Sequence, residues 1–116
     1  MAQPYLENLS QLIAGLALSI AGVKLETKHF FSGAALYANG KICASLSPAG
    51  FALKLPADKR QELIESRMGS EFRFFPSGPI KHEYVTLSEP LIQDDKAFRA
   101  LLGISINYVL GKQRDV

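Results

Sequence analysis

Residues 28–55 read KHFFSGAALYANGKICASLSPAGFALKL, and this stretch contains the clearest strand and turn patterns of the sequence. Apolar and polar residues alternate along three short runs within it, which is the pattern of strands with one buried face. Asn39-Gly40 separates the first two runs and supplies the positive φ angles that a two-residue hairpin turn requires. The tripeptide Pro-Ala-Gly at 48–50 makes the second turn. Two consecutive hairpins predict an antiparallel meander.

Helical periodicity flanks this meander on both sides. Before it, aliphatic residues recur every three or four positions and predict one apolar helix face: Leu6, Leu9, Leu12, Ile13, Leu16 and Ile20. We expect this helix to end at Gly22, because glycine adopts the left-handed cap conformation without a Cβ clash. After the meander, Pro56 fits the first turn of a second helix that ends near Gly69. A third helix begins at Asp94 or Asp95 and places one set of residues on a single face: Phe98, Leu101, Leu102, Ser105 and Val109.

Two further strand-like runs, 72–75 and 82–87, lie between the second and third helices. The predicted order is α-β-β-β-α-β-β-α, and the run 25–30 offers an additional strand. Strands that are not separated by crossover helices favour an antiparallel sheet, so we expect an α+β fold of about five strands with helices packed on one face. The length of 116 residues suits one domain, with 112–116 as a frayed tail.

The bulk composition excludes several classes of protein. With 47% hydrophobic and 21% charged residues, the chain has the composition of an ordinary globular protein. The net charge of +2 is too small to indicate nucleic acid, a membrane or an acidic partner. The uncharged run 12–23 is shorter than the roughly 20 residues of a membrane span, and no Lys or Arg precedes it as in a secretory signal. We therefore expect a cytoplasmic protein without membrane association.

Few residues offer catalytic or metal-binding chemistry. The cysteine and histidine ligands are Cys43, His29 and His82, and their spacing does not match a metal site. Cys43 lies inside a predicted strand, with no helix N-terminus after it to lower the thiol pKa. The sequence therefore predicts no catalytic residue, no metal and no cofactor. An enzyme that uses Cys43 or His82 is the least favoured interpretation.

Aromatic residues fall in or beside the predicted strands, and five basic residues accompany them: Lys28, Lys41, Lys54, Arg73 and Lys81. Such interleaving on a sheet can stack single-stranded bases. Alternation, however, sends Phe72 and Phe74 to the face opposite Arg73, which indicates that most of the rings belong to the core. If one sheet face is free, we expect it to carry Tyr37, Cys43, Ser45, Lys54, Arg73 and Phe75. A half-apolar face of this kind suits another protein chain better than nucleic acid.

Several motifs resemble the N-terminal domain of the TfoX (Sxy) family. The run FSGAALYANGK at 31–41 resembles the family's Arg-x-Met-Phe-Gly-Gly-x-Gly-Leu-Tyr-x-Asp-Gly pattern, and GFALKL at 50–55 resembles its Leu-Tyr-Leu-Lys strand. The segment GSEFRF at 69–74 resembles its Gly-Ser-x-x-Phe-x-Tyr segment. The resemblance covers about residues 24–111. This sequence departs from the pattern at Lys28 and His29, which replace an arginine, and at Ser32 and Ala35, which replace glycines.

The resemblance implies a function without catalysis. TfoX proteins are regulators associated with natural competence, usually with a C-terminal helical domain that we do not expect in a chain ending at Val116. The resemblance implies a regulatory or adaptor domain that works by protein–protein contact, and its motif defines no catalytic residue. The candidate interaction surface comprises Lys28, His29, Tyr37, Lys54, Arg73 and Phe75. The partner's identity stays open, with a homodimer through the free sheet face or an edge strand as one option. A nucleic-acid-associated regulator that uses a basic and aromatic sheet face is the alternative.

Overall fold

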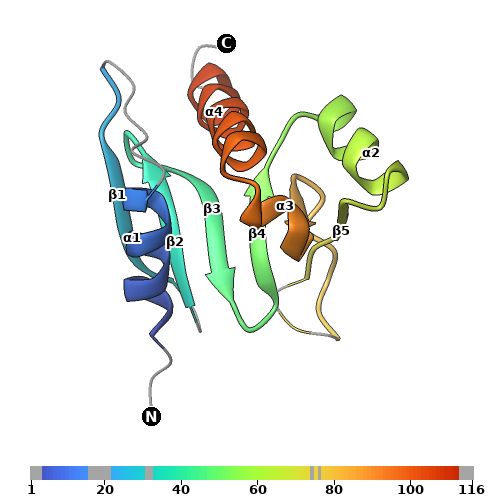
Figure 1. The fold of residues 1–116 in the computed structure, drawn as a ribbon, viewed down its shortest axis with the longest axis horizontal. Helices are drawn as coiled ribbons and strands as arrows, with labels where there is room; N and C mark the ends of the chain where they lie inside the picture. Colours follow the sequence, from blue (N-terminus) through green and yellow to red (C-terminus); the bar gives the residue numbers. More distant parts are fainter. Residues whose placement is uncertain (1–3, 16–21, 31–32, 74, 76, 113–116) are drawn as a thin grey trace.

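The computed structural model describes residues 4–15, 22–30, 33–73, 75 and 77–112, and its ribbon is drawn in Figure 1. Several residues used in the predictions lie outside these ranges: Leu16, Ile20, Phe31, Ser32, Phe74 and the tail residues 113–116. Lys112, where the predicted tail begins, is the last residue of the C-terminal helix. In the ranges that are described, no helix combines the length and the apolar character that a membrane span requires.

Six antiparallel strands form one sheet in the order β1-β2-β3-β4-β6-β5, which confirms the predicted α+β class. The strands are β1 (Leu25–Phe30), β2 (Gly33–Ala38), β3 (Lys41–Ser47), β4 (Gly50–Lys54), β5 (Gly69–Glu71) and β6 (Tyr84–Leu87). The additional run at 25–30 is therefore a strand, and it raises the number from five to six. The strand predicted at 72–75 begins earlier, because β5 reaches β6 through Gly69, Ser70 and Glu71, whereas the Phe72 ring packs against Tyr84.

Four helices pack against the sheet: α1 (Tyr5–Gly15), α2 (Ala57–Glu65), α3 (Glu89–Gln93) and α4 (Asp95–Lys112). Figure 1 shows α1 and α4 in front of the sheet, where α1 packs on β1 to β3 and α4 packs on β2 to β4. The short helix α3 packs on α4 and was not predicted. At the start of α4, the Asp94 carboxylate accepts a hydrogen bond from the Ala97 N–H at 3.2 Å, which confirms the predicted cap.

The predicted hairpin turn between β2 and β3 is confirmed. Asn39 and Gly40 have φ angles of 49° and 83°, as a two-residue turn requires. The Asn39 side chain also reaches back along the chain, since its Oδ1 accepts a hydrogen bond from the Lys24 N–H at 2.7 Å. This turn therefore holds the beginning of β1 as well as joining the two strands.

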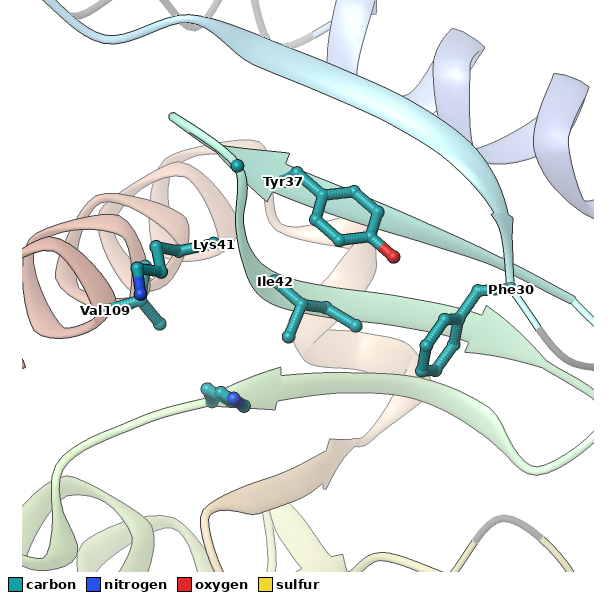
Figure 2. Close-up of a pocket in the computed structure, with 7 residues that line it drawn as sticks. Phe30, Tyr37, Lys41, Ile42 and Val109 are labelled. Carbon is teal, nitrogen blue, oxygen red and sulfur yellow. The ribbon is translucent and has the colours of Figure 1, made fainter.

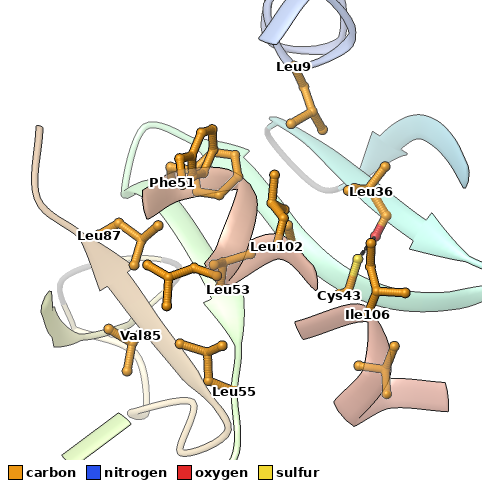
Figure 3. Packing of buried hydrophobic residues seen from close by; sticks show 14 of the residues in the cluster. Leu9, Leu36, Cys43, Phe51, Leu53, Leu55, Val85, Leu87, Leu102 and Ile106 are labelled. Atoms are coloured by element: carbon orange, nitrogen blue, oxygen red, sulfur yellow. Dashed lines mark hydrogen bonds between the residues drawn. The ribbon is translucent and has the colours of Figure 1, made fainter. Parts of the chain in front are cut away.

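The core lies between the sheet and the helices α1 and α4 (Figure 3). One row of paired residues crosses four strands, namely Leu36, Ala44, Leu53 and Val85, and all four are fully buried. Leu9 covers this row from α1, and α4 covers it with Phe98, Leu102 and Ile106. We call this side of the sheet the covered face.

A β-bulge in β3 overturns one prediction. Leu36 pairs with Ala44 while the next residue, Tyr37, pairs with Ile42, so that Cys43 is an extra residue without a partner on β2. Cys43 consequently belongs to the buried cluster of the covered face. The prediction that Cys43 lies on the free face is wrong, because simple alternation along β3 does not anticipate the bulge.

Candidate interaction surface

The other side of the sheet, which we call the outer face, has small side chains at its centre and larger ones around them. Ala35, Ser45 and Ala52 oppose one another on β2, β3 and β4, one position along from the row of the covered face. Larger outer-face residues surround them: Lys28, Phe30, Tyr37, Ile42, Lys54 and Tyr84. Ile42 joins this set because the bulge at Cys43 reverses the direction of the side chains that precede it on β3.

A hollow of about 500 Å³ extends along the outer face to the end where the β2–β3 hairpin turns, and there it reaches Val109 of α4. Its lining, which defines the Tyr37 hollow, consists of Phe30, Tyr37, Gly40, Lys41, Ile42, Lys54 and Val109. Figure 2 shows Tyr37 and Ile42 next to each other on β2 and β3, while the Phe30 ring reaches from the end of β1 across the neighbouring strands. The floor of the hollow is therefore aromatic and aliphatic, and lysines stand at its border.

The Phe30 ring can cross the sheet because its partner on β2 is Gly33. A Cβ atom at Gly33 would run into the backbone of Leu46 and Ser47 on β3. The strands thus approach closely at this point, and no side chain of Gly33 competes with the ring for space. This pairing is the feature that brings Phe30 to the Tyr37 hollow.

Two lysines of the outer face lie over aromatic rings. Lys28 Nζ is 5.2 Å from the centroid of the Tyr37 ring, and Lys54 Nζ is 5.5 Å from the centroid of the Tyr84 ring. Both distances fall within the range of a cation–π interaction. Lys54 is held further by the Glu83 carboxylate, which lies 3.8 Å from Lys54 Nζ. Lys28 and Lys41 form no ion pair within the described ranges, so their charges are available to a partner.

Burial governs the two pKa values that shift near this surface. It raises the pKa of the Cys43 thiol to about 12, although Lys54 and a hydrogen bond with Ser105 act in the opposite direction. Burial likewise raises the pKa of the Tyr84 phenol, and Cys43, Glu83 and Tyr37 raise it further through the negative charge that each carries when ionised. Both groups are therefore protonated and neutral at neutral pH.

The groups considered for catalysis or metal binding differ in their exposure. Cys43 is fully buried on the covered face, whereas His29 and His82 are exposed. His82 borders a second hollow, of about 400 Å³, together with Arg60 and Ile64 of α2. Among the residues that the structure describes, no cluster of three or more His, Cys, Asp or Glu side chains could hold a metal ion.

The six residues of the predicted interaction surface fall into three places. Lys28, Tyr37 and Lys54 lie together on the outer face beside the Tyr37 hollow. His29 pairs with Ala34, and alternation along β1 directs it to the side opposite Lys28. Arg73 donates a hydrogen bond to the Gly78 carbonyl at 2.9 Å, and the ring of Phe75, which is 56% exposed, packs on the same glycine. These last two residues belong to the connection between β5 and β6.

Five residues that line the hollow are not among the six predicted surface residues, and two of these five, Phe30 and Ile42, are placed only by strand pairing. Ile42 was assigned to the opposite face from Cys43, and only the bulge reveals that Ile42 is the residue on the outer face. Phe30 was noted among the aromatic residues but not placed, because its position depends on the pairing with Gly33 across the strands. The sequence of a single strand does not reveal the position of either residue, because both positions depend on the pairing of β1, β2 and β3.

Comparison with known protein families agrees with the motifs. The sequence model of the TfoX N-terminal domain matches residues 18–108, which is most of the chain and all six strands of the sheet. The match confirms the resemblance noted at 31–41, 50–55 and 69–74. No curated protein matches the chain.

Proposed function

Since the chain belongs to the TfoX N-terminal domain family, we propose that it is a non-enzymatic regulatory or adaptor domain that acts by binding another protein. The observation that carries the proposal is the Tyr37 hollow on the outer face. Aromatic residues are enriched at the centres of protein interfaces, where they supply a large contact area at low entropic cost. A partner would place an apolar side chain against Tyr37 and Ile42, and acidic groups against Lys28 and Lys41.

The lysines favour a partner segment that is acidic as well as apolar. Lys41 is exposed at the hairpin tip, and Lys28 is held over the Tyr37 ring at the border of the hollow. Glu26 is the nearby residue of opposite sign on β1, and Lys24 already lies 3.9 Å from its carboxylate. Charge complementarity of this kind mainly accelerates association and selects the partner.

A capture experiment tests this proposal. The tagged chain is cross-linked in its native cells, purified and compared with the variant Lys41→Glu/Ile42→Ser. The matched control, Ile64→Ser/Lys96→Glu, changes the same residue types on α2 and α4, away from the hollow. We expect wild type and control to capture the same protein and the hollow variant to lose it by at least about 10-fold, the factor that 1.4 kcal/mol represents. Equal capture by all three chains would contradict binding through the hollow.

A second candidate function, binding of single-stranded nucleic acid, is favoured by one observation. Lys28, Lys41 and Lys54 gather around Tyr37 and Tyr84, and interleaved cations and rings can follow a phosphate backbone while stacking its bases. Arg73, which was assigned to the same role, instead donates a hydrogen bond to Gly78. Lys28, Lys41 and Lys54 are therefore the cations that support this function.

The salt dependence of binding distinguishes the two candidates. Each lysine that contacts a phosphate of a single strand contributes about 0.7 to the slope of log affinity against log salt. Replacing Lys28, Lys41 and Lys54 by Gln should therefore lower the slope by about 2 if nucleic acid binds there. The matched control replaces Lys59, Arg67 and Lys96 by Gln. Absence of salt-dependent oligonucleotide binding by the wild-type chain would exclude this candidate.

Alkylation of Cys43 tests the enzyme interpretation. A catalytic cysteine requires a thiolate with access to solvent, whereas the Cys43 thiol is buried and its pKa is raised. We expect iodoacetamide to react with Cys43 more slowly in the folded protein than in the urea-unfolded chain. Faster reaction in the folded protein would contradict a non-enzymatic function.

A further inference from the structure

β1 is an outer strand of the sheet, and in the described part of the chain it pairs with β2 alone. It contains six residues, Leu25–Phe30, whereas the other outer strand, β5, contains three and has α2 packed beside it. Every second residue of an outer strand directs its N–H and C=O groups away from the sheet. Such an edge can pair with a strand of another chain.

The charges along β1 match a second copy of the same strand. In a two-fold antiparallel pair with the axis perpendicular to the sheet, opposed residues must lie on the same sheet face. An axis through Thr27 meets this condition and places Glu26 opposite Lys28 of the second copy. By symmetry, Lys28 then opposes Glu26 of the second copy, so that two Glu–Lys ion pairs form across the interface.

The neighbouring registers are disfavoured by the same charges. An axis through Glu26 would place the two copies of that carboxylate opposite each other, and an axis through Lys28 would do the same with two ammonium groups. Like charges that oppose each other across strands are destabilising, while opposite charges contribute roughly 0.2–1 kcal/mol per pair. The axis through Thr27 is therefore the register that the strand specifies.

We propose that the chain forms a two-fold dimer in which β1 pairs with β1 of a second copy in this register, giving one continuous sheet. The interface adjoins the Tyr37 hollow, because β1 also contributes Phe30 to its lining and Lys28 to its border, but the pairing of the strands does not require a partner in the hollow. Lys28 is exposed, and Glu26 retains 38% side-chain exposure, so both can reach across the edge when they exchange their contacts with Tyr37 and Lys24 for each other. On the outer face, the dimer brings the two Tyr37 hollows onto a single surface.

The helices leave room for this pairing. α1 packs on β1, β2 and β3 from the covered face, which centres it near β2. Strands lie about 4.8 Å apart, so β2 would lie about 7 Å from the dimer axis and the two copies of α1 about 14 Å apart. Closely packed helices are separated by roughly 8–10 Å, so the two α1 helices would not clash. Figure 1 shows α1 in front of β1 and β2, with no labelled element beyond β1.

Charge reversal tests the register. Sedimentation equilibrium across a concentration series gives the dimer dissociation constant for wild type, Glu26→Lys and Lys28→Glu. Each single reversal creates two like-charge pairs in the proposed dimer, and we expect the dissociation constant to rise by about 10-fold or more. The control Glu65→Lys makes the same charge change on α2 and should leave the constant unchanged.

Restoration of opposite signs completes the test. An equimolar mixture of Glu26→Lys and Lys28→Glu chains again opposes each lysine with a glutamate, as does the double variant Glu26→Lys/Lys28→Glu. We expect both to recover wild-type dimerisation. A wild-type chain that stays monomeric throughout the series would overturn the dimer. Dimers that form equally well in all variants would overturn the β1 interface, because they would show that another surface mediates association.

Discussion

The two faces of the sheet are formed by alternate residues of the same strands, yet they differ in size and chemistry. The covered face has the row Leu36, Ala44, Leu53 and Val85, which α1 and α4 seal. One position along each strand, the outer face has the row Ala35, Ser45, Ala52 and Thr86. Large aliphatic side chains therefore lie where helices cover them, and small ones occupy the centre of the other side.

Because of this difference, we expect the covered face to determine the stability of the domain and the outer face to bind a partner. Buried aliphatic side chains contribute most of the stabilising free energy of a small domain. The outer face keeps its large residues at the border, where Phe30, Tyr37, Ile42 and Lys54 line a hollow rather than a core. The comparison predicts that substitutions on the covered face change folding, whereas equivalent substitutions on the outer face change binding.

The largest expected effect comes from truncating one leucine of the covered face. Leu53→Ala removes a fully buried side chain beneath α4 and should lower the free energy of unfolding by about 3 kcal/mol. Ile42→Ala on the outer face is the matched truncation, and it should cost about 1 kcal/mol because Ile42 borders the hollow and is partly exposed. Urea denaturation measures both values. Equal losses would show that the outer face carries core packing as well.

A smaller effect tests how tightly the covered face is packed at its β5 end. A Cβ atom at Gly69 would collide with the Val85 side chain and approach Leu63 of α2. Gly69→Ala should therefore destabilise the protein by about 2 kcal/mol through overpacking. Gly103 on α4 has no atom within 4 Å of the corresponding Cβ position, so Gly103→Ala should stabilise the helix by about 0.5–1 kcal/mol. Thermal unfolding of the two variants should shift in opposite directions.

Much of this arrangement follows from local sequence. Alternation along 33–54 and the turn at Asn39-Gly40 predict the meander, and the helical periodicity of 98–109 predicts α4. Alternation alone predicts Tyr37 and Lys54 on the free face, and the structure places both on the outer face near Lys28, another residue of the predicted interaction surface. These features depend on spacing within one element, which is why they can be predicted.

The remaining features depend on contacts between elements. The bulge at Cys43 exists because β2 and β3 pair in a register that shifts between Leu36 and Tyr37, and no residue within β3 indicates it. The same pairing moves Ile42 to the outer face. β5 begins at Gly69, where a Cβ atom would collide with Val85 on the neighbouring strand, whereas the aromatic run after it suggested a later strand.

The pH dependence of stability tests the position of Cys43 on the covered face. The ordinary pKa of this thiol is 9.0, and burial raises it to about 12 in the folded protein. Between these values the unfolded chain releases the proton that the folded protein retains. Stability from this group is therefore complete below about pH 8 and falls as the pH rises from about 9 towards 12, by at most about 1.4 kcal/mol per pH unit.

Comparison with Cys43→Ala isolates this contribution. The free energy of unfolding is measured in urea from about pH 8 to about pH 11 for both chains. Tyr84 also has a raised pKa, and charge at Cys43 is one of its causes, so both chains are measured with the additional substitution Tyr84→Phe. We expect the wild-type protein to lose stability more steeply than the variant. Parallel curves would contradict a desolvated thiol in the core.

The smallest effect comes from two buried serines, one on each side of the sheet. Ser105 lies on α4, and its hydroxyl donates a hydrogen bond to the Cys43 carbonyl at 3.0 Å. Ser45 lies on the outer face between Ala35 and Ala52, and its buried Oγ has no hydrogen-bond partner among the described residues. The two side chains are chemically identical and are both almost fully buried, so the main difference in their interactions is the hydrogen bond.

Replacing each serine by alanine should therefore change stability in opposite directions. Ser105→Ala removes a satisfied hydrogen bond and leaves the Cys43 carbonyl without it, which should cost about 1 kcal/mol. Ser45→Ala removes a buried hydroxyl without a partner, beside two alanines that already fit a methyl group, and should raise the free energy of unfolding by about 1 kcal/mol. Urea denaturation with an unchanged m-value measures both shifts. Destabilisation by Ser45→Ala would show that the Ser45 hydroxyl has a hydrogen-bond partner. The buried serines on both sides of the sheet would then be hydrogen-bonded.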